Sequence, residues 1–248
     1  MRISDLLLRS GVKRSDSVVV YCSLNGKEWD MAALLQELTD FFAPGTLVMP
    51  VGHDEMSAVP GGIFDPVQTP SGEGVLSEMF RQLPVVIRSR HPAGSLAALG
   101  ADSVWLMADH EKCISEFSAS SPWWKLFQKG TKCIFIGCGL ERSCMIAAAE
   151  EWAGSARLSK RYCRRRLALG NGRNRRLRIK VHTGRHYRYY PKVEELFRDA
   201  GLLSRNRWDC CDVLVFNSSE CVSRLLRLLC RKKTLFASGR VPRNLKMF

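Results

Sequence analysis

The sequence predicts an α/β fold built around a central sheet, and two observations carry this prediction. Residues 17–23, 46–50 and 132–139 are short and mostly apolar, as expected for buried parallel strands. Between the first two runs, residues 30–43 place apolar side chains at helical spacing, and Pro44-Gly45 ends that helix. Strand, helix and strand in this order form a βαβ unit, which places the chain among α/β proteins.

The remaining elements continue this alternation along the chain. A long loop from Val51 to Pro70 contains several glycines and prolines, and loops of this length are usually functional or mobile. We expect a single domain over residues 1–240, with a frayed tail at 241–248. The other predicted elements are helices near 4–12, 72–83, 121–129, 142–153, 191–201 and 219–233, and strands near 85–88 and 212–218.

Composition excludes several classes of protein. Apolar residues make up 46% of the chain and charged residues 25%, which is incompatible with wholesale disorder. No stretch approaches the roughly 18 apolar residues of a membrane span, and the Leu6–Leu8 patch is too short for a signal peptide. We therefore expect a soluble, cytoplasmic protein.

The ten cysteines argue against a disulfide framework and against a metal site. Cys22, Cys133 and Cys138 lie in or beside apolar runs, where cysteine packs as a small hydrophobic residue. The chain has no Cys-x-x-Cys pair and no Cys/His spacing typical of zinc. These patterns predict a reducing compartment and no bound metal.

The net charge of +14 is confined to one segment. Between Trp152 and Val193 lie 14 of the 38 lysines and arginines and no acidic residue, and the other 24 equal the 24 aspartates and glutamates. This segment, predicted as a basic β-ribbon over 157–190, suits nucleic acid, anionic lipid or an acidic small molecule, or is simply a solvated face. Interleaved Tyr187, Tyr189 and Tyr190 would suit stacking on single strands, but nucleic-acid binding is the less favoured interpretation.

Strand ends supply the candidate binding edge, because ligands of open α/β sheets bind outside the carboxyl ends of the strands. Three such ends stand out: Cys22–Leu24, Met49–Pro50 and Gly137–Gly139. Neither a Walker lysine motif nor Gly-x-Gly-x-x-Gly after the first strand is present. The phosphate-binding motif of the common acetyltransferase superfamily is also missing, since Leu167 occupies its first, polar position in LALGNG.

The most specific part of the sequence is residues 64–100, which read FDPVQTPSGEGVLSEMFRQLPVVIRSRHPAGSLAALG. This segment resembles the core signature of the aminoglycoside 3-N-acetyltransferase family. The similarity extends outward to YCSL at 21–24, GTLVMP at 45–50, SPWWKL at 121–126 and IFIGCG at 134–139, and covers about residues 1–230. The matching positions of the core are Phe64, Asp65, Thr69, Pro70, Ser71, Gly74, Glu78, Phe80, Arg81, Arg88, Ser89, His91, Pro92, Ser95, Ala97 and Gly100.

The resemblance implies a central sheet flanked by helices, a C-terminal β-rich basic portion, and transfer of acetyl from acetyl-CoA to an amine. It also implies that the two loops around Ser23 and Arg88 approach the cofactor, with Asp65 near the acceptor. Arg88 would face a phosphate or pair internally with Glu78 or Asp65. A structural role for His91, and turn caps at the serines, remain open. The implied cofactor-binding residues are Ser23, Leu24, Arg88, Ser89, His91 and Ser95.

The catalytic helix departs from the family pattern of Thr, two residues, His, two residues, Glu. Here Cys144 stands at the Thr and Glu150 at the Glu, but Ala147 replaces the histidine that would take the proton from the amine. His53 near a strand end, or Glu150 directly, would have to act instead. Cys144 is either a covalent nucleophile or an inert packed thiol. An acceptor that is already deprotonated would need little help.

We therefore predict an acetyl-CoA-dependent N-acetyltransferase acting on an amino sugar or aminoglycoside-like amine. The alternative is a weakened or inactive relative that binds acyl-CoA but lacks the general base. The basic excess favours an acceptor that carries phosphate or another acidic group, because a polycationic drug would be repelled. A small-molecule acceptor is the expected partner, with a homodimer left open.

Overall fold

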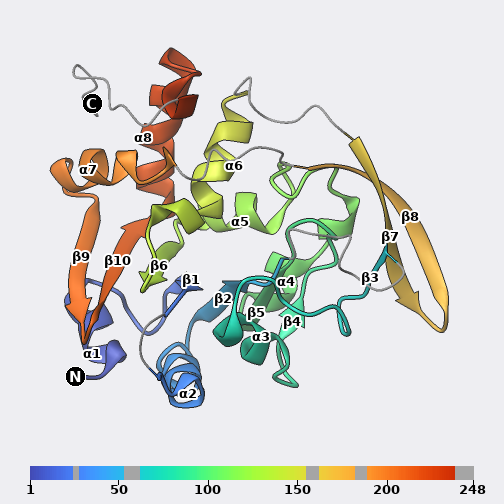
Figure 1. Cartoon of the computed structure of the whole chain (residues 1–248), viewed down its shortest axis with the longest axis horizontal. Helices are drawn as coiled ribbons and strands as arrows, with labels where there is room; N and C mark the ends of the chain where they lie inside the picture. The colour runs from blue at the N-terminus through green and yellow to red at the C-terminus, as the bar shows by residue number, and fades with distance from the viewer. Residues whose placement is uncertain (25–27, 53–61, 155–161, 182–188, 238–248) are drawn as a thin grey trace.

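The computed structural model describes residues 1–24, 28–52, 62–154, 162–181 and 189–237. Its centre is a seven-stranded sheet in the order β4-β5-β2-β1-β6-β10-β9 (Figure 1). The middle strands β2, β1 and β6 run parallel, whereas β5 and β10 pair antiparallel to them on either side. The strands are β1 Ser17–Cys22, β2 Thr46–Pro50, β4 Ile87–Arg88, β5 Leu96–Gly100, β6 Lys132–Ile136, β9 Leu203–Trp208 and β10 Cys211–Asn217.

Helices cover both faces of this sheet. Alternate residues of β1 explain why, since Val18 and Val20 belong to one buried cluster while Val19 and Tyr21 belong to the other. Helices α1 Ile3–Arg9, α2 Met31–Phe41 and α3 Val75–Arg81 pack on the first face. The second face carries α4 Ser103–Met107, α5 Pro122–Lys129, α6 Cys144–Trp152, α7 Lys192–Asp199 and α8 Ser218–Arg231.

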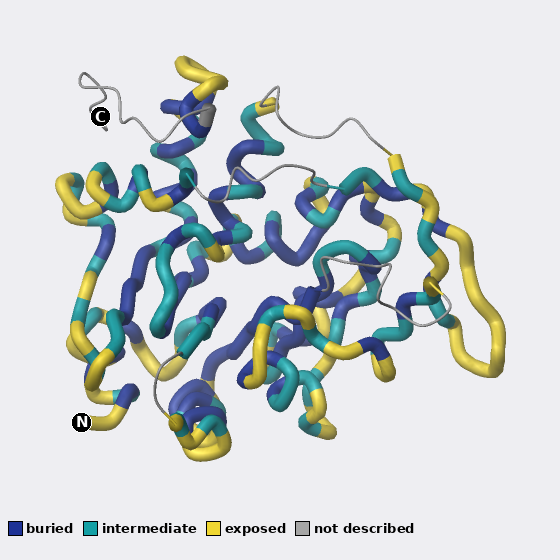
Figure 2. Tube along the Cα trace, in the orientation of Figure 1, coloured by how far each residue is buried: buried dark blue, intermediate teal, exposed yellow. Residues whose placement is uncertain are grey.

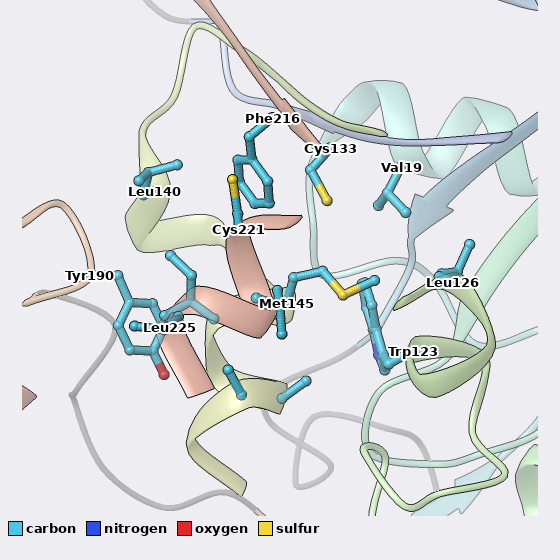
Figure 3. Packing of buried hydrophobic residues seen from close by; sticks show 14 of the residues in the cluster. Val19, Trp123, Leu126, Cys133, Leu140, Met145, Tyr190, Phe216, Cys221 and Leu225 are labelled. Atoms are coloured by element: carbon cyan, nitrogen blue, oxygen red, sulfur yellow. The ribbon is translucent and has the colours of Figure 1, made fainter. Parts of the chain in front are cut away.

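The sheet and the inward faces of these helices form the buried interior (Figure 2). Figure 3 shows the second face, where Met145 of α6 and Leu225 of α8 lie among the aromatic side chains of Trp123, Tyr190 and Phe216. Side-chain caps begin the helices that matter for the site. Ser143, for example, accepts a hydrogen bond from the backbone N–H of Ile146 at 3.3 Å and so starts α6.

The predicted α/β class with a helix-flanked sheet is confirmed. Two strands of this sheet are not among the predicted elements, however. The segment Leu96–Gly100 forms β5, although its alanines and glycine carry little strand signal. The polar strand Leu203–Trp208 was also missed, because its sequence LSRNRW has few apolar residues and its strand is stabilised by pairing with β10.

A second, three-stranded sheet lies beside the main one. It consists of β3 Ile63–Phe64, β7 Tyr162–Gly170 and β8 Arg173–Lys180, with β7 and β8 pairing as an antiparallel hairpin. A small buried cluster of Phe64, Leu167, Leu177 and Ile179 holds the base of this hairpin. The predicted ribbon 157–190 therefore contains a hairpin in its described part, whereas Tyr187 and the tail 241–248 lie outside the described residues.

Within the described ranges, no helix has the length and apolarity needed to cross a membrane. No group of three or more histidine, cysteine or acidic side chains is arranged there to hold a metal ion. All ten cysteines fall within these ranges and are present as free thiols.

Candidate active site

The carboxyl ends of β1, β2 and β6 meet at one edge of the sheet, as the parallel pairing requires. Gly137, just after β6, has a φ of +67°, and a Cβ there would lie 2.7 Å from the Ser23 carbonyl oxygen and 2.6 Å from Leu24 Cδ2. Only glycine therefore permits the two strand ends to approach this closely. A pocket of about 470 Å³ opens here, lined by Ser23, Leu24 and Gly137–Gly139 together with residues of β9 and β10.

The backbone of Ser23 is already used by the sheet. Its N–H donates to the carbonyl of Ile136 at 3.0 Å, which extends the pairing of β1 with β6 beyond the strand. That N–H is therefore not available to hold a thioester oxygen. Ser23 and Leu24 line the pocket, and their contact with the cofactor stays a prediction.

Helix α6 begins at the same edge and carries the predicted catalytic positions. Glu150 is only 1% exposed, and the Tyr190 hydroxyl donates to its Oε2 at 2.7 Å. Burial, with the nearby Glu150 charge, raises the pKa of Tyr190, so this phenol stays protonated and donates. Glu150 therefore ties α6 to the start of α7. At this depth it cannot reach an amine in a crevice, which corrects the prediction that it acts directly as a base.

Cys144 and Ala147 lie one turn apart on the same face of α6, and both are partly exposed. The Cys144 Sγ lies 3.9 Å from the carbonyl oxygen of Arg142. The position of Cys144 at the sheet edge is compatible both with a covalent nucleophile and with an inert packed thiol. His53, the other catalytic candidate, lies outside the described residues.

Arg88 does not face an open pocket. Its guanidinium donates to the carbonyl oxygens of Val51, at 2.7 Å, and of Thr69, and its Nε donates to Ser95 Oγ at 3.1 Å. The group also lies 5.0 Å from the centre of the Phe64 ring. Burial, reinforced by Arg81, lowers its pKa to about 10. Arg88 thus clamps two loops together, which corrects its prediction as a phosphate ligand. Its internal partners are also not the carboxylates first considered, because Glu78 pairs with Arg81.

Ser89, His91 and Ser95 are buried beneath the same loop, with at most 2% exposure. Ser89 Oγ accepts from the backbone N–H of Leu96 and lies 2.9 Å from Nδ1 of His110. The His91 ring stacks on that of His110, with 4.7 Å between centroids. Burial lowers the pKa of His91 to about 4, so the pair is neutral near pH 7. The prediction of direct cofactor contact by these three side chains is therefore replaced by a role in holding the loop.

Asp65, the predicted acceptor-binding residue, organises a turn. Its Oδ1 accepts from the backbone N–H of Val67 at 2.8 Å and of Gln68 at 3.2 Å, which is an Asx turn. Its own backbone N–H donates to Thr69 Oγ1 at 2.9 Å. The carboxylate is thus engaged by its own loop, which explains its occurrence in the family signature without requiring contact with an acceptor.

Tyr21 is a site residue that the sequence reasoning missed. Its ring stacks on Phe135 with 4.6 Å between centroids, and its buried hydroxyl has no hydrogen bond of normal geometry among the described residues. Burial raises the pKa of Tyr21 well above its usual value, with smaller contributions from Cys144, Cys133 and Glu73, while the backbone N–H of Cys144 acts in the opposite direction. A buried tyrosine hydroxyl normally finds a partner, so this one is a candidate donor to a ligand. The sequence feature that could have identified Tyr21 as a candidate is its position at the start of the YCSL segment.

Charged groups of both signs lie near the strand-end crevice. A small cavity lined by Tyr21 also includes Glu73 and Arg142, whose charged groups lie 3.8 Å apart. Glu116 and Glu150 both lie close enough to Tyr190 to contribute to its raised pKa. Glu116 also packs on Gly94, where a Cβ would lie 1.8 Å from its Oε2. Carboxylates of this kind attract cationic groups such as ammonium.

The helix-flanked sheet, with its strand-end crevice, has the architecture of α/β proteins that bind ligands at the carboxyl edge of the sheet. A family model described as aminoglycoside 3-N-acetyltransferase matches residues 21–229, so the chain belongs to this family. The predicted family is confirmed, and with it the predicted class of N-acetyltransferase.

Relatives and solved structures agree with this assignment. Aminoglycoside N(3)-acetyltransferase VII of Streptomyces paromomycinus is 36% identical over 92 residues, which cover 36% of this chain and 32% of that protein. The SPbeta prophage-derived aminoglycoside N(3')-acetyltransferase-like protein YokD of Bacillus subtilis is 27% identical over 228 residues, covering 80% and 78%. The chain thus spans about a third of the first relative and most of the second.

Two solved structures share the fold. The apoenzyme of aminoglycoside acetyltransferase AAC(3)-IVa superposes with a TM-score of 0.79 at 23% identity, covering 97% of this chain and 90% of that one. AAC-IIIb in a binary complex with CoASH gives a TM-score of 0.79 at 20% identity, covering 93% and 95%. At these identities the structural similarity establishes the fold.

Proposed function

We propose that this protein transfers the acetyl group of acetyl-CoA to an amino group of an aminoglycoside, in the crevice between the β1 end and the first turn of α6. The observation that carries the proposal is the family match over residues 21–229, which includes both of these elements. The pocket lined by Ser23, Leu24 and Gly137–Gly139 supports it, because its position at the strand ends suits a cofactor arm that reaches the start of α6.

Tyr21 supplies the electrostatic part of this proposal. When the amine nitrogen attacks the thioester carbonyl carbon, negative charge develops on the carbonyl oxygen. A protonated phenol whose O–H has no acceptor of normal geometry among the described residues, held rigid by its stack on Phe135, would donate to that oxygen at little cost in reorganisation. As the bond from carbon to sulfur breaks, the coenzyme A thiolate leaves and the nitrogen loses its proton.

The proton acceptor of the family is a histidine, and Ala147 occupies its position in this chain. His53 directly follows Gly52, where a Cβ would lie 3.9 Å from Glu73 Oε1. We propose His53 as the base, since it is the candidate whose neighbour in the chain lies at the crevice and Glu150 is buried. Cys144 then has a packing role, because no covalent intermediate is needed.

The acceptor is proposed to be cationic. The basic excess that had favoured an anionic acceptor includes the hairpin of β7 and β8, and no residue of that hairpin lines either of the pockets described above. Glu73 lines the cavity at Tyr21, and Glu116 lies near Tyr190. These carboxylates would attract a polyamine sugar although the whole chain is positive.

Release of free thiol from acetyl-CoA tests the proposal with two acceptor panels, gentamicin-type aminoglycosides and amino sugar phosphates. Turnover with the aminoglycosides is expected. Turnover with the phosphates alone would contradict the proposed acceptor. Binding of coenzyme A by calorimetry without turnover of any amine would instead support the weakened relative, and no binding by folded protein would contradict both.

The Ala147→His variant tests the missing general base. Ala147 lies three residues before Glu150 on one helix face, so an imidazole there would occupy the family's catalytic position. We expect kcat to rise about tenfold or more, within the range that a positioned base supplies. Ala153→His, at the C-cap of α6, is the matched control and should leave the rate unchanged. A rate that falls in the first variant would show that the crevice no longer accommodates the histidine.

Three predictions from the sequence stand beside this function as proposals. They are a single domain over residues 1–240, a cytoplasmic location, and a homodimer. Light scattering of the purified chain gives the oligomeric state, and a mass of one chain, 28.0 kDa, would contradict the dimer. Limited proteolysis that yields one resistant core would support the single domain.

A further inference from the structure

The hairpin formed by β7 and β8 concentrates positive charge in a way that the acetyl-transfer site does not use. We call residues 162–180 the basic finger. Its two strands hold seven arginines, one lysine and no acidic residue. The register places Arg164 opposite Arg178 and Arg166 opposite Arg176. Like charges directly opposite each other destabilise a sheet, so this pattern works against the stability of the hairpin.

The outer half of the finger projects from the protein. Every residue from 169 to 176 is exposed, on both faces of the ribbon, and the hairpin extends away from the main sheet (Figures 1 and 2). Only the base is held, through Leu167, Leu177 and Ile179 packed on Phe64. The arginines of the tip are therefore available to a large partner.

Several arginines of the finger are not neutralised within the described part of the chain. There, Arg164, Arg173 and Arg176 form no ion pair with a carboxylate. Arg178 lies 4.4 Å from the centre of the Tyr162 ring, an interaction that keeps its charge. An anionic partner that binds between and beside the neighbouring arginines would explain why an exposed ribbon keeps charges that repel each other.

We propose that the basic finger binds double-stranded DNA, with the two-stranded ribbon inserted in the major groove and its arginines on the flanking phosphates. The major groove of B-form DNA, about 12 Å wide, admits a two-stranded β-ribbon. Regularly spaced cations on a convex surface match a regularly spaced polyanion, whereas a small anion needs a concave site. Binding of this kind depends on phosphate contacts and carries no sequence preference.

Other anionic partners fit the finger less well. The major groove of A-form RNA is too narrow for a ribbon. Single strands need aromatic platforms, but Tyr190 is buried against Glu150 and the ring of Tyr162 is already engaged by Arg178. Insertion into a membrane would require apolar side chains at the tip, and between 169 and 176 only Leu169 has one.

Fluorescence anisotropy with a labelled 20-base-pair DNA duplex tests the proposal, over salt concentrations from 50 to 200 mM. If four to six phosphates are neutralised, the logarithm of the association constant should fall with a slope of about −4 to −5 against the logarithm of salt. Replacing Arg173, Arg175 and Arg176 with glutamine should reduce the magnitude of that slope by about 2.7 and weaken binding at least tenfold at 100 mM salt.

A charge-matched triple variant on α8 and its C-cap is the control. Replacing Arg227, Arg231 and Lys232 with glutamine removes the same net charge from exposed positions at another place on the molecule (Figure 1). This control should bind the duplex nearly as tightly as the unmodified chain. Thermal unfolding of both triples establishes that each is folded, and thiol release from acetyl-CoA should be unchanged in the finger triple.

The outcomes are distinguishable from those for the proposed function, since acetyl transfer and DNA binding are measured separately. Equal loss of affinity in the two triples would show attraction by net charge alone and would overturn the role of the finger. Tighter binding to an RNA duplex, a single strand or phosphatidylserine vesicles than to the DNA duplex would also overturn the proposal. So would the absence of salt-dependent binding by folded protein.

Discussion

The crevice at the start of α6 and the basic finger show opposite uses of charge in one chain. At the crevice, charged groups have partners: Glu73 lies 3.8 Å from Arg142, and the buried Glu150 accepts a hydrogen bond from Tyr190. In the finger, arginines are exposed and oppose one another across the ribbon. The net charge of +14 therefore describes the finger and its surroundings, and it misleads when it is used to choose the acceptor.

Burial accounts for the difference in behaviour between the two regions. Near the crevice it lowers the pKa of His91 to about 4, lowers that of Arg88 to about 10 and raises that of Tyr21. Each of these groups is held in one protonation state by a rigid environment. The finger is exposed to solvent and screened by salt, so its arginines act by their number and spacing. One such group in the crevice therefore changes the free energy of the folded state by about a few kcal/mol, whereas one exposed charge in the finger changes it by a fraction of that.

The largest effect is expected from removing the Tyr21 hydroxyl. Tyr21→Phe should lower kcat by about 10²–10³, as for the loss of one donor to a developing oxyanion, with little change in KM. Because the hydroxyl is buried without a partner of normal geometry, its removal should also leave the free energy of unfolding unchanged or raise it by about 1 kcal/mol. Steady-state kinetics and urea denaturation measure the two quantities.

Opposite changes in activity and stability would distinguish a catalytic donor from a packing residue. Tyr162→Phe, at an exposed position on the finger, is the matched control and should change neither quantity. An unaltered kcat in Tyr21→Phe would exclude the donor role. A loss of stability above about 1 kcal/mol would indicate that the hydroxyl has a structural partner in solution.

The second effect concerns the His91–His110 stack and depends on pH. The folded-state pKa of His91, about 4, lies below the unfolded value of about 6.5. The unfolded chain therefore binds the proton first as pH falls. The contribution of the neutral His91 side chain to the free energy of unfolding is fully present above pH 6.5. It is lost between about pH 6.5 and 4, and the loss amounts to at most about 3 kcal/mol. Burial also lowers the pKa of His110, so this residue should make the loss of stability with falling pH steeper.

Urea denaturation at pH 7.5, 6 and 5 would measure this dependence. His91→Asn should flatten the profile, even if it lowers stability at pH 7.5, because one of the two protons is no longer taken up on unfolding. A wild-type profile that is flat between pH 7.5 and 5 would contradict the buried, neutral pair.

The sequence predicted the class of fold and the family because both depend on local patterns. Apolar runs marked β1, β2 and β6, and the residues of 64–100 carried the family signature. The strands β5 and β9 could not be predicted in the same way, since their small or polar residues become strands only by pairing with β2 and β10. Strands of such composition depend on their neighbours more than on their own propensity.

Residue roles were harder to predict than residue positions. The sequence placed Arg88, His91 and Ser95 in one loop, but their partners are largely backbone carbonyls or distant rings, which no motif specifies. The hydrogen bond from Tyr190 to Glu150 spans 40 positions in the chain. Tyr21 was overlooked because a tyrosine in an apolar strand is ordinarily a packing residue, and only its hydroxyl, buried without a partner of normal geometry, indicates otherwise.

The smallest expected effect is in the finger, where a substitution should stabilise the protein, whereas most substitutions destabilise it. Arg164 lies directly opposite Arg178, so Arg164→Thr removes a like-charge pair and introduces a residue that favours strands. The free energy of unfolding should rise by about 0.5 kcal/mol at low salt, and the gain should vanish near 1 M salt, where screening is nearly complete. Differential urea denaturation against the unmodified chain measures it. A loss of stability at low salt would mean that Arg164 has an anionic partner within the protein, and the finger would then resemble the crevice in pairing its charges internally.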